Sequence, residues 1–189
     1  MTIPGLRAPC YTQGMRKVLL ILLLTVSVPG LEAHVHTGVL AGGSWALSTG
    51  PASSLNGAGR ITLFIDNHEA HWPASLGLAI GYSPYTLSGA TGYSYRLTSL
   101  ALRSWWTTPL GLPEWLALEA GVMAGAGFER LGNDSRGGYS RAFLLGSGLR
   151  TRFDLGPVQT GLELDWEWVI EPETAASFLT AGLFVALRL

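Results

Sequence analysis

Apolar and polar positions alternate near the carboxyl end of the chain. Between Val158 and Ile170, large apolar side chains occupy one set of alternate positions, and Glu163, Asp165 and Glu167 lie in the other set. Successive side chains of an extended strand point to opposite faces, whereas a helix would spread both sets around its circumference. This segment is therefore predicted to be a β-strand with one apolar face and one acidic face.

The same alternation recurs along the chain, while helical spacing of apolar residues is missing after residue 33. Between Ala74 and Tyr82, for example, Leu76, Leu78 and Ile80 alternate with small residues. The pattern predicts eight strands, at residues 37–48, 58–66, 74–83, 92–106, 114–129, 138–153, 157–170 and 176–189.

The connections between these strands alternate in character. Those after the second, fourth and sixth strands carry Pro and Gly turn signals, at residues 66–73, 107–113 and 154–156. Those after the first, third and fifth strands are rich in Ser, Gly and Asn, at residues 49–57, 84–91 and 130–137. An antiparallel up-and-down meander follows, with turns at one end and looser loops at the other.

Two barrel architectures use such a meander, and they differ in which face is apolar. A soluble lipocalin-type barrel has an apolar cavity, whereas a transmembrane barrel has an apolar outside and a polar interior. In the sixth strand, Phe143 and Leu145 alternate with Gly146, Gly148 and Arg150. Charges beside glycines suit the crowded interior of an eight-stranded barrel. We therefore predict an all-β fold, an eight-stranded antiparallel up-and-down transmembrane β-barrel, with a soluble barrel as the alternative.

The first part of the chain has the layout of a secretory signal. Met15-Arg16-Lys17 precede the apolar run from Val18 to Val28, and Pro-Gly-Leu-Glu-Ala follows. The apolar run has about half of the ~20 residues that a membrane-spanning helix needs. We expect residues 1–33 to be a signal peptide whose translation starts at Met15, and residues 34–189 to be the barrel domain.

Composition narrows the classes of function. The chain is 48% hydrophobic and only 13% charged, whereas soluble domains carry about 25% charged residues. A formal net charge of −1 disfavours a nucleic-acid partner, and Cys10, the single cysteine, gives neither a disulfide nor a thiolate metal site. An ordinary cytosolic enzyme is disfavoured, and we expect no cofactor.

Charged residues fall mostly at positions that face the lumen of the predicted barrel. They are Arg60, Asp66, Arg103, Glu119, Glu129, Arg150, Arg152, Glu163, Asp165, Glu167 and Arg188. We interpret them as an ion-pair plug, because a lumen this narrow leaves no room for an open channel, and an ion path is the alternative. If the turn pairs Phe153 with Val158, Arg150 lies opposite Gly161 and diagonal to Glu163.

Aromatic residues cluster near both ends of the predicted strands. Two interfacial girdles are expected: Trp72, Trp105, Trp106 and Trp115 by the turns, and Tyr82, Tyr85, Tyr93, Tyr95, Trp166 and Trp168 by the loops. With an even number of strands, both termini lie at the turn end, which should be periplasmic.

Four histidines are expected at that same end. His68-Glu-Ala-His71 differs from the zinc-protease motif, in which two histidines four apart lie on a helix. His34 and His36 begin the mature chain. We predict no metal site, and weak metal binding by these side chains stays open.

The last strand resembles a known family. Residues 182–189, Gly-Leu-Phe-Val-Ala-Leu-Arg-Leu, alternate Leu183, Val185 and Leu187 with small or aromatic residues and place Arg188 second to last. This resembles the closing strand of small outer-membrane barrels of the OmpA transmembrane-domain and OmpX type. The resemblance implies an integral outer-membrane protein recognised by the barrel-assembly machinery through this strand, although the family usually ends in Phe where this chain has Leu189.

A structural, membrane-stabilising or surface-interaction role is the leading functional hypothesis, with outer-membrane lipid as a partner and the extracellular partner unknown. A narrow ion-conducting pore is the alternative. A lipid-modifying outer-membrane enzyme is a further alternative, but such enzymes are expected to pair Ser with His near the outer leaflet, and all four histidines are predicted at the opposite end. We therefore predict no enzymatic activity.

Overall fold

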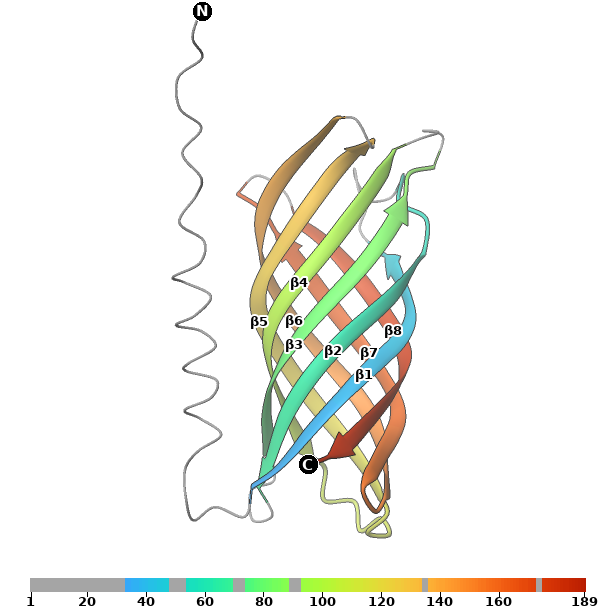
Figure 1. Ribbon diagram of the computed structural model, residues 1–189, viewed down its shortest axis with the longest axis vertical. Coiled ribbons are helices and arrows are strands. Elements are labelled where there is room, and N and C mark those ends of the chain that lie inside the picture. The colour runs from blue at the N-terminus through green and yellow to red at the C-terminus, as the bar shows by residue number, and fades with distance from the viewer. Residues whose placement is uncertain (1–32, 48–53, 70–73, 89–92, 134–135, 173–174) are drawn as a thin grey trace, which may run out of the picture. The chain divides into compact units, whose positions relative to one another are not determined.

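The computed structural model is a closed antiparallel barrel of eight strands (Figure 1). It describes residues 33–47, 54–69, 74–88, 93–133, 136–172 and 175–189. The predicted signal peptide therefore lies outside the described residues, apart from Ala33. In the described ranges no helix is long and apolar enough to cross a membrane.

Each strand pairs with the next in the chain, and β8 pairs with β1 to close the barrel. The strands are β1 (Ala33–Ala46), β2 (Ala58–Glu69), β3 (Ala74–Thr86), β4 (Ser94–Thr107), β5 (Leu116–Asn133), β6 (Arg136–Leu155), β7 (Val158–Ile170) and β8 (Ala175–Arg188). The predicted fold class is confirmed, and both ends of the barrel sequence lie at the same end of the barrel (Figure 1).

The β5–β6 connection is shorter than predicted. Residues 130–137 were expected to form a loop, but β5 continues to Asn133 and β6 begins at Arg136, with Gly132 paired to Gly137. A high content of Ser, Gly and Asn does not prevent two backbones from pairing. Arg130 consequently lies on a strand.

The large apolar side chains point outward. In β7, Leu164 is 43% exposed and Asp165 is 4% exposed, and the same alternation runs along β3. An apolar outside around a charged inside is the reverse of a lipocalin-type barrel, so the facing predicted for a transmembrane barrel is confirmed.

Three aromatic residues that were predicted for the girdles point into the lumen instead. Tyr85, Tyr95 and Trp105 occupy the alternate strand positions whose side chains face the lumen. Trp105 is 1% exposed. The Trp105 ring fills the space above Gly121, where a Cβ atom would collide with it. Trp106, Trp115, Tyr82, Tyr93 and Trp166 are exposed, Trp168 is partly buried, and Trp72 lies outside the described residues.

The β6–β7 turn sets a different register from the one expected. Gly156 and Pro157 form a two-residue connection that pairs Leu155 with Val158. Gly156 has a φ of 76°, which suits the first central position of a type II′ hairpin. Because the turn is two residues tighter than assumed, Arg150 lies directly opposite Glu163, and the predicted pairing with Gly161 is wrong.

Candidate functional site: the charged lumen

Charged side chains from five strands meet inside the barrel. All are at most 9% exposed, and they are Arg60 and Asp66 of β2, Arg103 of β4, Glu119 of β5, Arg150 and Arg152 of β6, and Glu163, Asp165 and Glu167 of β7. Strand alternation turns each of them inward, and several lie opposite a glycine, such as Arg103 opposite Gly77 and Asp165 opposite Gly148. The structure thus places these nine sequence-predicted residues in the lumen.

Arg60 and Glu167 form a bidentate ion pair across the lumen. Arg60 Nη1 and Nη2 donate to the two Glu167 carboxylate oxygens at 2.7 and 2.6 Å. Arg60 Nε also donates to Thr62 Oγ1 at 3.2 Å, and Nη2 donates to Ser99 Oγ at 3.3 Å. The guanidinium group therefore has a partner for each nitrogen, which is what a buried charge requires.

A second bidentate pair joins Arg103 to Asp66. The distances from Nε and Nη2 to the carboxylate oxygens are 2.8 and 2.6 Å. Arg103 Nη1 also donates to Glu163 at 3.2 Å. The guanidinium carbon lies 4.0 Å from the Phe64 ring centroid, a cation–π distance. Arg103 is thus held from three directions.

Arg150 and Arg152 extend this network toward the end of the barrel that carries the termini. Arg150 bonds to Glu119 and, at 3.2 Å, to Asp66. Arg152 donates to Glu119 at 2.5 Å and to Asp154 at 3.1 Å. The ion pairs therefore run without interruption from Arg103 to Asp154, a continuous belt of alternating charge through this half of the lumen.

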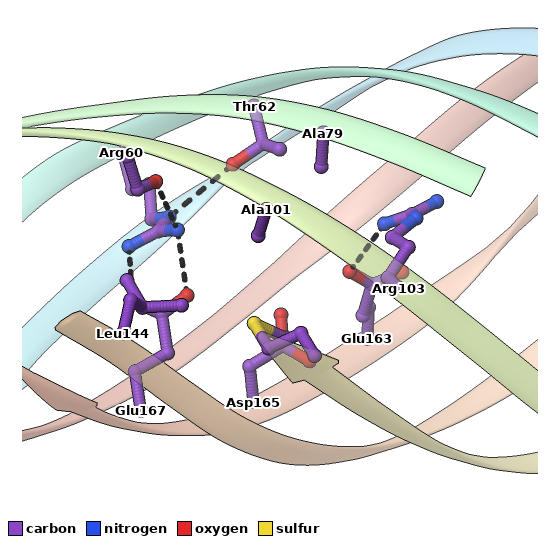
Figure 2. Close-up of a pocket in the computed structure, with 11 residues that line it drawn as sticks. Arg60, Thr62, Ala79, Ala101, Arg103, Leu144, Glu163, Asp165 and Glu167 are labelled. Atoms are coloured by element: carbon purple, nitrogen blue, oxygen red, sulfur yellow. Dashed lines mark hydrogen bonds and ion pairs between the residues drawn. The ribbon is translucent and has the colours of Figure 1, made fainter. Parts of the chain in front are cut away.

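A small cavity is lined by Arg60 and Glu167 on one side and by Arg103 and Glu163 on the other (Figure 2). Its volume is about 10 Å³, close to the minimum for one water molecule. Glu163 Oε2 and Asp165 Oδ1, two buried oxygens of lining residues, have no hydrogen-bond partner.

Arg188 does not join the network, which corrects the prediction. Its Nη2 bonds to His34 Nε2, and the side chain is exposed. Arg188 is the last residue of β8 and pairs with His36 near the start of β1. It therefore lies at the rim of the barrel, where the strands no longer enclose an inward-pointing side chain. Glu129, near the other end, accepts from Ser140 Oγ at 3.1 Å.

Three histidines do gather at the end that carries the termini. His34 pairs with His68 across β1 and β2, and the His36 and His68 ring centroids are 6.5 Å apart. His71 lies outside the described residues. Among the described side chains, no group of three or more His, Cys, Asp or Glu residues is placed to hold a metal ion.

Sequence reasoning missed several neutral members of the site. Trp105 lies 4.5 Å from the Arg150 guanidinium carbon, and Thr62 and Ser99 bond to Arg60. Residues two or four apart on a strand share a face. Thr62 is two residues from Arg60, and Trp105 and Ser99 are two and four residues from Arg103, so this spacing could have identified all three.

Comparisons with known proteins show the fold. No protein-family description matches the chain, and no curated protein matches it. Among solved structures, Neisserial surface protein A has a TM-score of 0.58 at 10% identity, covering 83% of this chain and 97% of that chain. A major outer membrane protein from Thermus thermophilus has a TM-score of 0.54 at 15% identity, covering 83% and 99%.

The attachment invasion locus protein of Yersinia pestis, Ail, gives a TM-score of 0.51 at 12% identity, covering 84% of this chain and 99% of that chain. At such identities the likeness concerns architecture alone. The chain has the fold of the small eight-stranded outer-membrane barrels.

Proposed function

We propose that this protein is an integral outer-membrane barrel with a lumen closed by ion pairs and a structural, membrane-stabilising or surface-interaction role. The observation that carries the proposal is the combination of an apolar outer face with a lumen whose arginines each bond to at least one carboxylate. An apolar surface of this kind is stable in lipid and unfavourable in water.

The height of the apolar surface supports a membrane location. The outward-facing residues of β5 are apolar from Leu116 to Phe128. A rise of ~3.3 Å per residue and a strand tilt of ~40° give this run a height of about 30 Å. Outer-membrane barrels have apolar bands of about 25 Å, so the run is long enough to cross the hydrocarbon layer.

The ion pairs favour a closed lumen over the alternative of a narrow pore. An ion that crossed the barrel would have to displace buried guanidinium and carboxylate groups from each other. Removing one partner from such a pair costs about 3–5 kcal/mol. Pairs with Arg60, Arg103 and Arg150 would all lie along the path, so the barrier to conduction is large.

The location of the three described histidines disfavours the lipid-modifying enzyme considered above. Lipid-modifying barrels of the kind considered above need a histidine near the outer leaflet. His34, His36 and His68 are at the end of the barrel that carries the termini, which we propose to be the periplasmic end. The barrel-assembly machinery would read the closing strand, residues 182–189, at that same end.

Fractionation and gel migration test the membrane location. The full chain, expressed in a Gram-negative host, should be extracted from outer membranes only with detergent. It should also migrate differently before and after boiling, because a closed barrel resists detergent denaturation until heated. A protein recovered without detergent from the periplasm would contradict the proposal.

A further inference from the structure

The outward-facing surface of the strands carries very few charges. Among the outward-facing strand positions whose side chains the structure describes, only Arg96, Arg130 and Arg141 are charged, and none is acidic. The three belong to consecutive strands, β4, β5 and β6. Among these described positions, the surface is otherwise apolar or neutral, and we call its three arginines the arginine cluster.

The strand register brings these arginines together. Arg96 lies directly opposite Arg130, and Arg130 lies directly opposite Tyr139. Arg141 follows two residues after Tyr139 on the same face, so it is diagonal to Arg130, at a separation of about 7–8 Å. The Arg130 guanidinium carbon lies 5.4 Å from the Tyr139 ring centroid. The three arginines therefore lie on the same face of three adjacent strands.

Like charges placed directly opposite each other destabilise a sheet, so an anion shared by Arg96 and Arg130 would be stabilising. Arg96 and Arg141 also have interactions within the chain, so a ligand would add to those contacts. Arginine is the side chain best suited to phosphate, because its planar donor groups form paired, charge-assisted hydrogen bonds. The cluster is therefore complementary to a phosphate group.

The cluster lies at the border of the apolar surface. Arg130 comes directly after Phe128 in the outward series of β5, and Arg141 comes directly before Phe143 in that of β6. Phe128 and Phe143 are 42% and 52% exposed. This border is at the loop end, opposite the termini. In a membrane, lipid headgroups lie at such a border, and acyl chains cover the apolar residues beside it.

We propose that Arg96, Arg130 and Arg141 bind the phosphorylated headgroup of an outer-leaflet lipid, whose acyl chains lie on the adjoining apolar surface. The proposal rests on the proposed function, because it requires the barrel to span the outer membrane with its loop end outside. It gives the membrane-stabilising role a specific lipid partner, held by Arg–phosphate bonds rather than by apolar contact alone.

Titration calorimetry of the full chain in zwitterionic micelles tests the proposal. The probes are lipid A with both phosphates and the same lipid with both phosphates removed. We expect the phosphorylated form to bind at least about tenfold more tightly, since one charge-assisted hydrogen bond is enough for that factor. The triple variant Arg96→Gln, Arg130→Gln, Arg141→Gln should lose this preference. Arg188→Gln, an exposed arginine at the other end, should keep it.

Equal affinity for the two lipids, or an unchanged preference in the triple variant, would overturn the proposal. A second measurement on the unaltered chain does not depend on how the variants fold. Raising salt from about 0.1 M to 1 M shortens the screening length from about 10 Å to 3 Å and should weaken binding of the phosphorylated lipid. Binding that is insensitive to salt would contradict an electrostatic site. A barrel that inserts into membranes yet does not discriminate between the lipids leaves the proposed function intact and removes this inference alone.

Discussion

Replacing Leu164 by arginine tests the facing of the barrel at its most sensitive position. Leu164 is the central residue of β7 and pairs with Leu149 and Ala181 on the neighbouring strands. Its side chain points outward, so an arginine there would enter the middle of the hydrocarbon layer. Arginine on the lipid face near the midplane costs about 2–4 kcal/mol, and we expect Leu164→Arg to lower the free energy of unfolding by that amount.

Asp165→Asn is the matched control on the next residue. Asp165 faces the lumen, takes part in no ion pair that the described residues show, and has one oxygen without a hydrogen-bond partner. Asparagine has nearly the same shape, and its amide can donate to the neighbouring Glu163. The change in stability should stay within about 1 kcal/mol, the net value of one hydrogen bond.

Reversible unfolding by urea in lipid vesicles, followed by tryptophan fluorescence, measures both variants against the unaltered chain. The slope of the free energy against urea concentration should be the same for all three proteins, so that midpoints can be compared directly. If Leu164→Arg were milder than Asp165→Asn, the two faces of β7 would be reversed. The lumen network built on Glu163 and Glu167 would then be refuted as well.

Three further substitutions test separate parts of the structure. Arg150→Ala removes one of two arginine partners from Glu119 and from Asp66, which keep Arg152 and Arg103, and should cost about 1.5–3 kcal/mol in urea unfolding, whereas Arg188→Ala, at the exposed rim, should cost under about 1 kcal/mol; similar losses would show that Arg150 is not buried. Gly125→Ala places a Cβ against the backbone of β4 and should cost about 1–3 kcal/mol, while Gly59→Ala meets nothing within 4 Å; equal melting temperatures for the two would refute this close approach. Gly156→Ala strains a turn with positive φ and should cost about 1–2 kcal/mol, measured as a faster unfolding rate; an unchanged rate would argue against the type II′ turn.

The facing of each strand was predictable because it depends only on the two-residue period. Once Glu163 is assigned to the lumen, Asp165 and Glu167 must follow, and Leu164 must point outward. This rule needs no knowledge of neighbouring strands. It placed the charged network inside the barrel from the sequence alone, and it would have placed Tyr85 and Trp105 there too had it been applied to the aromatic residues.

Cross-strand partners were not predictable in the same way. Whether Arg150 lies opposite Gly161 or Glu163 depends on the number of residues in the β6–β7 turn, and a two-residue change preserves the facing while it exchanges every partner. Arg188 shows a related limit. The two-residue period predicts which way its side chain points, but it does not predict where the wall of the barrel ends. The arginine cluster became visible only when the β5–β6 hairpin proved to continue beyond the expected strand ends.

The conductance of the purified protein in planar lipid bilayers tests most directly the claim that the barrel is a closed membrane protein. Heat-modifiable migration verifies on the same preparation that the barrel is folded. The ion pairs of Arg60, Arg103 and Arg150 predict no single-channel steps above the background of the bare bilayer. Stable steps that vanish on Arg150→Ala or Glu163→Gln would contradict a closed lumen and identify the charged network as an ion path.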